Sequence, residues 1–233
     1  MLQKEQYVER LFASIAPRYD LLNSILSFSR HKRWRAFAVR QCGLHPGDRA
    51  LDVCAGTLDF AVELSKAVGP SSEVVGVDFC RPMLDLGRRK LKKRGMGNIL
   101  LVEGNAECLP VRSSSFAAAT IGFALRNVVS VENTLAEMVR AVKPGGRVAC
   151  LELAKPEGRI FARVYNLYFY HVLPFVGGLI NRRREPYEYL PASLTAFYSR
   201  EELSQIMEKV GLADIRVHDL TGGVAVVHVG IKK

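Results

Sequence analysis

The spacing of apolar positions changes character twice along this chain. From about residue 3 to residue 42, apolar side chains such as Leu11, Leu22 and Trp34 recur at helical spacing, which predicts N-terminal helices. Between about 49 and 153, short apolar runs of strand length alternate with amphipathic stretches of helical length. This alternation indicates βαβ units and a parallel sheet that is covered by helices on both faces.

The end of the chain departs from that alternation. An aromatic stretch from about 157 to 195 predicts further helix, and one more helix is predicted in "SREELSQIMEKVG". Two apolar runs follow, "DIRVHDL" and "VAVVHVG", separated by the turn "TGG". Strands joined by a tight turn pair antiparallel, so we predict an α/β fold whose mostly parallel, seven-stranded sheet ends in a hairpin.

Length and composition favour one globular domain over residues 1–233, because a chain of this size buries one sizeable core. The N-terminus lacks the apolar run of a signal peptide, which favours a cytoplasmic protein. The five cysteines show neither the C-x-x-C pairs nor the histidine partners of a zinc site, so we expect buried, reduced thiols and no metal.

The formal net charge of +10 favours an anionic partner, either nucleic acid or a membrane surface. Composition alone does not distinguish these partners from a soluble enzyme that is merely basic.

The decapeptide "LDVCAGTLDF", residues 51–60, joins the first predicted strand to the next helix, where dinucleotide-binding proteins carry Gly-x-Gly-x-x-Gly. Its one glycine, Gly56, makes a pyrophosphate a poor fit, and the chain has no triphosphate-binding G-x-x-x-x-G-K-[ST] motif. A nucleoside without phosphates fits better. Gly56 allows close approach of the backbone, Thr57 offers a hydroxyl, and the acidic Asp52 and Asp59 suit a cationic ligand.

The loops after the next strands extend this picture. Asp78 ends the second strand, where a carboxylate accepts hydrogen bonds from both ribose hydroxyls, and Asn105 and Ala106 follow the third. Such loops share one crevice in an open α/β sheet. S-adenosylmethionine, an adenosine with a sulfonium charge and no phosphate, matches this profile. Alternatively, Asp78 caps the following helix and Asp59 merely lies in the first turn of its own.

Longer motifs resemble one family. They are "RYDLLNSILSFSRHKRWR", "LDVCAGTLDFA", "VVGVDFCRPML", "GNAECLP", "FALRNV", "YEYLPASL" and "LTGGVAVVHVG", which run along nearly the whole chain. The chain resembles the ubiquinone/menaquinone biosynthesis C-methyltransferases, for which the first motif and "FALRN" are specific. The resemblance implies a class I S-adenosylmethionine-dependent methyltransferase fold, Rossmann-like, with residues 1–44 as a helical cover and 157–195 on the acceptor side. The implied substrate is a prenylated quinol, either a naphthoquinol of menaquinone biosynthesis or a methoxy-benzoquinol of ubiquinone biosynthesis.

The resemblance also assigns residues to the methyl donor. It implies donor contacts from Thr57, Asp78, Asn105 and Ala106. Two positions depart from the family pattern: Leu58 stands where the family usually carries glycine, and Gly122 where it usually carries serine. We expect Leu58 to narrow the donor pocket and Gly122 to remove a hydroxyl that the family uses.

Methylation of a quinol carbon requires loss of a phenolic proton. A phenol titrates near pH 10, so ionising it at neutral pH requires about 4 kcal/mol of differential stabilisation. Arg126 follows the fourth strand and is expected to face the crevice and stabilise the phenolate, while Asn127 orients the ring or a water. Resemblance makes Tyr19 a candidate for proton relay or acceptor positioning, and His31 a further one. A surface position for Arg126 and ordinary helix packing for Tyr19 are the alternatives.

The segment "FARVYNLYFYHVLPFVGGLI" offers an apolar route for an isoprenoid tail but is too short and interrupted to span a bilayer. Arginines 182–184 follow it directly, and the clusters "RHKRWR" and "RRKLKKR" add positive charge if they share a face. We therefore predict peripheral contact with the inner face of an anionic membrane; solvated helix faces are the alternative. The sequence leaves homo-oligomer formation open.

Two other functions compete with this interpretation. The charge would suit a nucleic-acid methyltransferase, but "IGFALRN" stands where such enzymes carry an Asn/Asp-Pro-Pro-aromatic motif, so we expect no nucleic-acid partner. A non-catalytic quinone- or lipid-binding protein that has lost the donor is favoured by Leu58 and Gly122. The presence of Asp78, Asn105 and Arg126 argues against it.

Overall fold

The computed structural model describes residues 2–156, 189 and 192–233. The predicted N-terminal helical region is divided into α1 (Leu2–Ile15), the 3-10 helix η1 (Ala16–Arg18), α2 (Tyr19–Leu26) and α3 (Arg30–Gln41). The chain turns between α2 and α3 at Phe28 and Ser29, whose φ angles of +50° and +58° are incompatible with continued right-handed helix.

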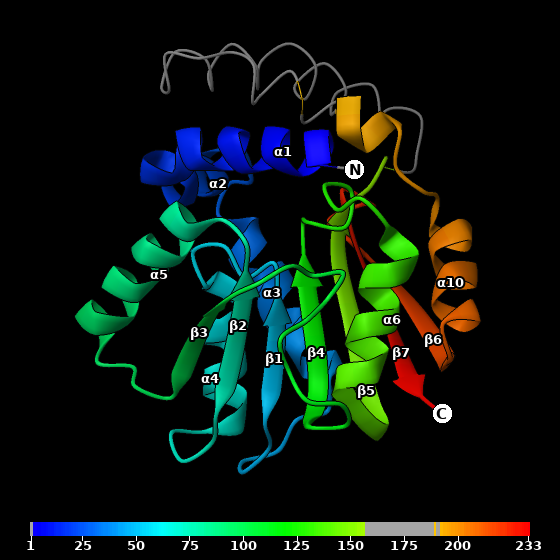
Figure 1. Cartoon of the computed structure of the whole chain (residues 1–233). Helices are drawn as coiled ribbons and strands as arrows, with labels where there is room; N and C mark the ends of the chain where they lie inside the picture. Colours follow the sequence, from blue (N-terminus) through cyan, green and yellow to red (C-terminus); the bar gives the residue numbers. More distant parts are fainter. Residues whose placement is uncertain (1, 157–188, 190–191) are drawn as a thin grey trace.

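The seven predicted strands form one sheet (Figure 1). They are β1 (Ala50–Val53), β2 (Val74–Asp78), β3 (Ile99–Glu103), β4 (Phe116–Gly122), β5 (Val142–Leu153), β6 (Leu212–Leu220) and β7 (Ala225–Lys232). Their order is β3-β2-β1-β4-β5-β7-β6. The first five pair in parallel, whereas β7 pairs antiparallel with both β5 and β6, which confirms the predicted terminal hairpin.

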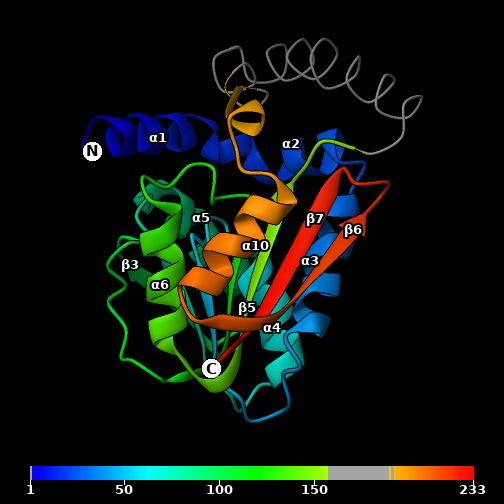
Figure 2. The same ribbon diagram turned by 90° about the vertical axis from the view of Figure 1, so that its right-hand side faces the viewer.

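Helices cover both faces of the sheet. On one face α3, α4 (Asp59–Val68) and α5 (Arg81–Arg94) pack on strand residues such as Ala50. On the other face α6 (Val131–Ala141) and α10 (Arg200–Lys209) pack on the alternate residues, such as Leu51 (Figure 2). The two apolar clusters follow the two-residue period of a strand and explain why β1 and β2 are buried along their whole length.

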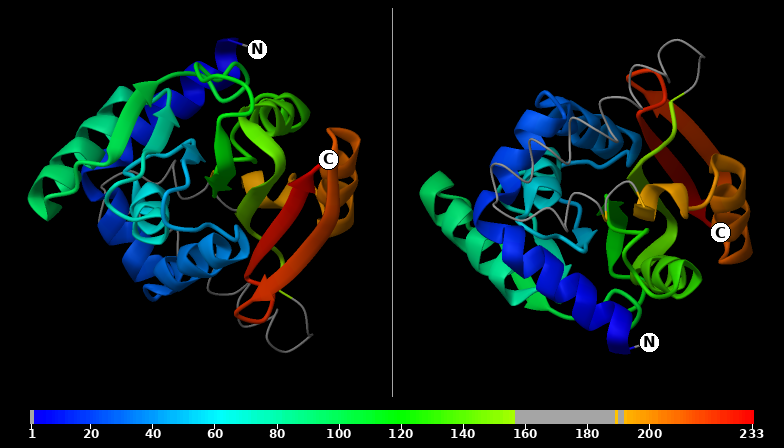
Figure 3. Two further views of the ribbon diagram at one scale, coloured as in Figure 1. Left: turned by 90° about the horizontal axis from the view of Figure 1, so that it is seen from below. Right: turned by 90° about the horizontal axis from the view of Figure 1, so that it is seen from above.

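Helices α1 and α2 lie across the carboxyl ends of the parallel strands (Figures 1 and 3). Two bonds fasten α1 to the loops there: Lys4 Nζ donates to the carbonyl of Val128, and Asn105 Nδ2 donates to Glu5 Oε1 at 3.0 Å. The third helix, α3, packs beside the sheet against α4, β5 and β7. Among the described helices of the predicted 1–44 cover, those that lie over the strand ends are α1 and α2.

Two further predictions concern the aromatic segment and the cysteines. Residues 157–188 and 190–191, which carry the aromatic segment and arginines 182–184, lie outside the described residues. All five cysteines are free; Cys42, Cys80 and Cys150 are buried and Cys54 is partly buried. The prediction of a buried thiol is wrong at Cys108, which is exposed because it lies in the tight turn after β3.

Candidate active site

A cavity of about 410 Å³ lies at the carboxyl ends of the parallel strands, beneath α1. The predicted crevice is confirmed, because the loops after four strands line this one cavity. They contribute Cys54 and Gly56 after β1, Asp78 and Phe79 from β2, Asn105 and Ala106 after β3, and Gly122, Phe123 and Ala124 from β4.

Asp78 is the carboxylate that joins two of these loops. Its Oδ2 accepts a hydrogen bond from the amide of Gly56 at 2.7 Å, and its Oδ1 accepts one from the amide of Cys80 at 2.7 Å. Cys80 is the N-cap residue of α5, so Asp78 braces the turn before the helix and does not cap the helix itself. Burial raises the pKa of Asp78 to about 6, against the lowering effect of these bonds. Since each carboxylate oxygen has two lone pairs, both remain able to accept a hydrogen bond.

The wall of this cavity is acidic. Its carboxylates are Glu5, Glu9, Asp78, Glu103 and Glu107, and the described residues that line it include no lysine, arginine or histidine. Some of these carboxylates are already paired: Glu103 bonds Arg81 at 3.0 Å, and Glu107 accepts from the amides of Val129 and Ser130. The excess of negative charge suits a cationic ligand and disfavours a phosphate.

Five of the predicted donor residues border a second, much smaller cavity, of about 20 Å³. Gly56 and Gly122 line both cavities, whereas Asp52, Thr57 and Asp59 line the small cavity and not the large one. The Asp52 carboxylate accepts bonds from the amide of Ala61 at 2.9 Å and from the hydroxyl of Thr120 at 3.2 Å, which ties β1 to α4 and β4. Burial raises its pKa to about 7.

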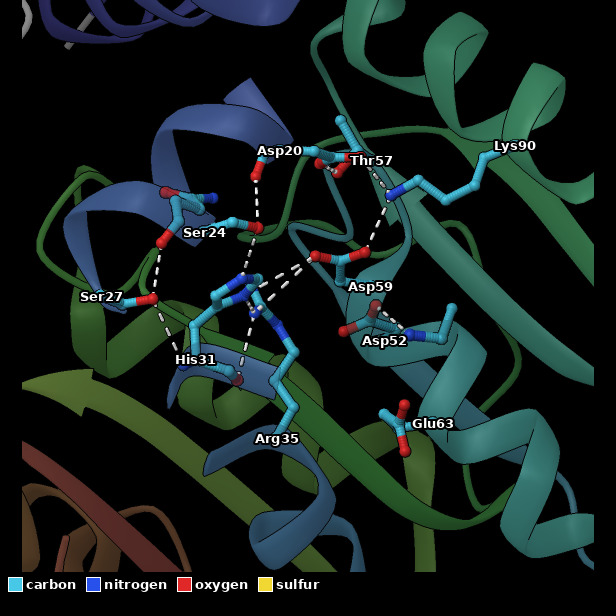
Figure 4. Close-up of polar contacts among 12 residues, drawn as sticks. Asp20, Ser24, Ser27, His31, Arg35, Asp52, Thr57, Asp59, Glu63 and Lys90 are labelled. Atoms are coloured by element: carbon cyan, nitrogen blue, oxygen red, sulfur yellow. Dashed lines mark hydrogen bonds and ion pairs between the residues drawn. The ribbon is translucent and has the colours of Figure 1, made fainter. Parts of the chain in front are cut away.

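Thr57 and Asp59 belong to a polar network that joins α2 to the loop between β1 and α4, which is the predicted donor loop (Figure 4). The Thr57 hydroxyl donates to Asp20 Oδ1 at 2.5 Å. Lys90 Nζ, on α5, lies 2.6 Å from Asp20 Oδ2 and 2.8 Å from Asp59 Oδ1. Arg35 approaches the other oxygen of Asp59 at 3.8 Å. Asp20 and Lys90 were not predicted as site residues, and their pairing depends on a contact between distant elements.

This geometry agrees with comparisons of the whole chain. The sequence profile of the ubiE/COQ5 methyltransferase family matches residues 1–232. The chain belongs to this family. It is 44% identical to a demethylmenaquinone methyltransferase of Geobacillus kaustophilus, over 99% of this chain and 98% of the relative. It is 46% identical to a demethylmenaquinone methyltransferase of Staphylococcus aureus (strain Newman), over 99% and 94%.

Solved structures share the fold of this ubiE/COQ5 family member. One is a SAM-dependent methyltransferase of Thermotoga maritima, a possible histamine N-methyltransferase, with a TM-score of 0.67 and 22% identity over 97% of this chain and 100% of that one. Another is a Haemonchus contortus phosphoethanolamine N-methyltransferase 2 bound to S-adenosyl-L-methionine, with a TM-score of 0.62 and 15% identity over 85% and 52%. The predicted methyltransferase fold is confirmed.

The two departures from the family pattern have physical causes in the packing around them. Leu58 has a left-handed φ of +69°, a conformation natural to glycine, yet its side chain is fully buried. It lies against Gly87 of α5 and Gly76 of β2: a Cβ added at Gly87 would be 2.6 Å from Leu58 Cγ. Leu58 therefore fills core between α4 and α5 and does not line either cavity, contrary to the expectation that it narrows the donor pocket.

Gly122 lines the large cavity with no side chain of its own. A Cβ added there would lie 2.8 Å from Cδ2 of Phe60, so the aromatic ring occupies the space that a serine side chain would need. The absence of a serine hydroxyl at position 122 and the position of the Phe60 ring therefore depend on each other.

Of the predicted catalytic residues, Tyr19 lines the cavities and His31 does not. Tyr19 lines both cavities, and burial raises the pKa of its phenol, so the hydroxyl is protonated at neutral pH. His31 is buried and lines neither cavity; its Nδ1 accepts from Arg35 at 2.5 Å and its Nε2 lies 3.2 Å from the hydroxyl of Ser24. Burial and Arg35 lower the pKa of His31 to about 4, so the ring is neutral and fixed.

Arg126 is not a surface residue. Its side chain is 7% exposed, and Nη1 donates to Glu152 Oε2 at 2.5 Å. Its Nε is buried without a hydrogen-bond partner in the described part of the chain. Arg126 lines neither cavity, but the next residue, Asn127, lines the large one and accepts a bond from the hydroxyl of Tyr189 at 3.1 Å. Glu152 was missed, although a lone acid within the apolar run "RVACLEL" was a visible signal.

The described residues contain no group of three or more His, Cys, Asp or Glu side chains able to hold a metal ion. They also contain no helix long and apolar enough to cross a membrane.

Proposed function

We propose that this methyltransferase transfers a methyl group from S-adenosylmethionine to a ring carbon of a prenylated quinol, namely demethylmenaquinol in menaquinone biosynthesis. The observation that carries the proposal is the acidic cavity of about 410 Å³ at the carboxyl ends of β1 to β4. The full-length similarity to demethylmenaquinone methyltransferases supports the choice of acceptor over a ubiquinone precursor.

The large cavity fits an adenosine that carries a positive charge. Asp78 lines the cavity, and its carboxylate keeps lone pairs that can accept hydrogen bonds from ribose hydroxyls. Gly56 leaves the backbone open there, and Asn105 and Ala106 line the wall expected beside the base. Bound there, S-adenosylmethionine supplies a methyl group on a positively charged sulfur. Asp52, Thr57 and Asp59 support the donor loop from behind, through the bonds that hold Ala61, Asp20 and Lys90.

The acceptor side is assigned to residues around the ion pair of Arg126 and Glu152. The unpaired Nε–H of Arg126 is a buried donor that a phenolate oxygen would satisfy, and its positive charge favours ionisation of the quinol. The partner Glu152 offsets that charge, so the pair stabilises an anion by less than a lone guanidinium would. The protonated Tyr19 hydroxyl and the Asn127 amide orient the ring. Helix α1 excludes water from above.

A direct product assay tests the reaction. The protein is incubated with donor labelled on the methyl group and with both demethylated quinols, the naphthoquinol and the methoxy-benzoquinol, and the labelled ring is identified by mass. We expect label on the naphthoquinol. Label on the benzoquinol alone would assign the protein to ubiquinone biosynthesis. Absence of both label and calorimetric donor binding would instead favour a non-catalytic quinone-binding protein.

The proposal places the enzyme in the cytoplasm, at the inner face of the membrane that holds its lipid substrate. The net charge of +10 and the apolar acceptor support this location.

A further inference from the structure

Helix α2 lies at the end of the sheet where the parallel strands terminate (Figures 1 and 2). That end carries the active-site cavity, and α2 and the turn after it expose large apolar side chains there. Leu21 is 55% exposed, Ile25 42% and Phe28 76%. The start of α3 adds three exposed basic residues, Arg30, Lys32 and Arg33. We propose that these six residues, which we name the α2 surface, dock the enzyme on an anionic lipid bilayer. The inference rests on the proposed function, because it specifies which face meets the membrane that holds the quinol.

The inner face of α2 makes contacts that hold the helix in place: Leu22 is 3% exposed, Tyr19 lines the cavity, and Asp20 bonds Thr57 and Lys90. Leu21 and Ile25 are four residues apart and therefore lie on the same side of the helix, and Phe28 follows in the turn. Three of the six large, exposed apolar residues among those described thus gather within eight positions of the chain.

The positive charge beside this apolar face favours binding to anionic lipid. In the described part of the chain, Arg30, Lys32 and Arg33 form no ion pair, so their charges are uncompensated by neighbouring carboxylates. The carboxylate of Asp20, the acid on α2, forms an ion pair with Lys90. Apolar side chains flanked by unpaired lysine and arginine are the pattern of a surface that inserts into the headgroup region and is held there electrostatically.

The fold separates the last basic residues of α5 from the α2 surface. Helix α5 runs from the carboxyl end of β2 to the amino end of β3, so Lys92, Lys93 and Arg94 lie at the far end of the sheet from α2 (Figure 1). These three residues therefore do not share a membrane-binding face with Arg30, Lys32 and Arg33. This separation supplies a control with the same charge and a different position.

The test is sedimentation with vesicles of phosphatidylglycerol and phosphatidylcholine, compared with vesicles of phosphatidylcholine alone. One variant combines Leu21→Ser, Ile25→Ser and Phe28→Ser; another combines Arg30→Gln, Lys32→Gln and Arg33→Gln. Each basic residue near an anionic surface contributes about fivefold in affinity, so the second variant should bind the anionic vesicles about a hundredfold more weakly. The apolar variant should lose about tenfold or more on the same vesicles.

Two control variants match these changes elsewhere. Lys92→Gln, Lys93→Gln and Arg94→Gln together remove the same charge, and Leu100→Ser removes an apolar side chain that is 48% exposed on β3. We expect both to bind vesicles within about twofold of the wild type, because neither lies on the α2 surface. Equal loss in the α5 control would mean that net charge alone drives binding, and would overturn the assignment.

A second measurement separates docking on lipid from damage to the active site and from dimer formation. All variants should methylate a short-tailed, water-soluble demethylated quinol at the wild-type rate and keep their circular dichroism spectra. If the wild type does not methylate the short-tailed quinol but binds vesicles through the α2 surface, the proposed function is wrong and the proposed membrane-binding surface is supported. If light scattering shows a dimer that the apolar variant converts to monomer, with no vesicle binding, a second copy covers α2 and the proposal is overturned.

Discussion

The contact between Leu58 and Gly87 predicts that Gly87→Ala destabilises the wild-type protein but stabilises the Leu58→Gly variant. Replacing glycine by alanine inside a helix normally stabilises a protein by about 1 kcal/mol. Gly87 lies within α5 and has no left-handed backbone angle, so this gain applies in principle. Its added Cβ would, however, lie 2.6 Å from both Cγ and Cδ1 of Leu58, which is fully buried.

The cost of overpacking and the gain in helix propensity together decide whether Gly87→Ala stabilises or destabilises the protein. Overpacking a core by one methyl costs about 1 to 3 kcal/mol, so Gly87→Ala in the wild type should destabilise by about 1 kcal/mol after its helical gain. Leu58→Gly alone should cost roughly 2 to 4 kcal/mol, since loss of a buried leucine outweighs relief of the left-handed backbone. In that background the space over Gly87 is empty, and Gly87→Ala should stabilise by about 1 kcal/mol.

Urea unfolding followed by circular dichroism measures the four free energies of this cycle. We expect a coupling of about 2 kcal/mol between the two positions, well above the few tenths that independent sites show. Gly97→Ala serves as the control, because its added Cβ has no neighbour within 4 Å and should couple to neither background. An effect of Gly87→Ala that is equal in both backgrounds would refute the packing argument. Donor affinity should be unchanged in Leu58→Gly, since Leu58 lines neither cavity.

Three further predictions concern the site. Since burial raises the pKa of Asp78 to about 6, its carboxylate is protonated below that pH, and calorimetric donor affinity should rise by up to about tenfold between pH 5 and 7; Asp78→Asn should weaken the donor and abolish this slope. Arg126→Gln combined with Glu152→Gln removes both charges of the buried pair, so turnover should fall at least about a hundredfold while the donor Kd stays within about threefold; near-normal turnover would remove Arg126 from the mechanism. Gly122→Ser should lower the free energy of unfolding by about 1 to 3 kcal/mol through its clash with Phe60, and Phe60→Leu should restore most of that loss in urea titrations; additive effects would contradict the shared packing.

The sheet and its crevice could be predicted because their signals are local. Apolar runs such as Val74–Asp78 record burial on both faces of a parallel strand, and the antiparallel end follows from a three-residue turn between two runs. Once the strands are parallel, the loops that follow them must meet at one edge, so the sequence alone could place Asp78 and Asn105 beside each other.

The roles of the neighbouring acids could not be predicted in the same way. Asp52, Asp59 and Asp78 all lie near the ends of adjacent strands, yet Asp78 alone among them lines the large cavity. The difference comes from partners on other elements, such as Lys90 for Asp59 and Thr120 for Asp52. Likewise, whether Leu58 narrows the pocket or fills the core depends on Gly87, which lies on α5. A loop sequence does not contain these contacts.

The same distant contacts link the two halves of the reaction. The Thr57 hydroxyl, next to the glycine of the donor loop, bonds Asp20, and Asp20 directly follows Tyr19, which lines the cavity from the cover. Lys90 is 14% exposed and pairs with both Asp20 and Asp59, so removing it would leave two carboxylates close together, with Arg35 at 3.8 Å from Asp59 as the remaining cation. The loop after β1 and helix α2 are therefore joined by a charged junction. Because α2 also carries the surface proposed to meet the bilayer, one short helix connects the proposed donor site, the proposed acceptor site and the proposed membrane contact.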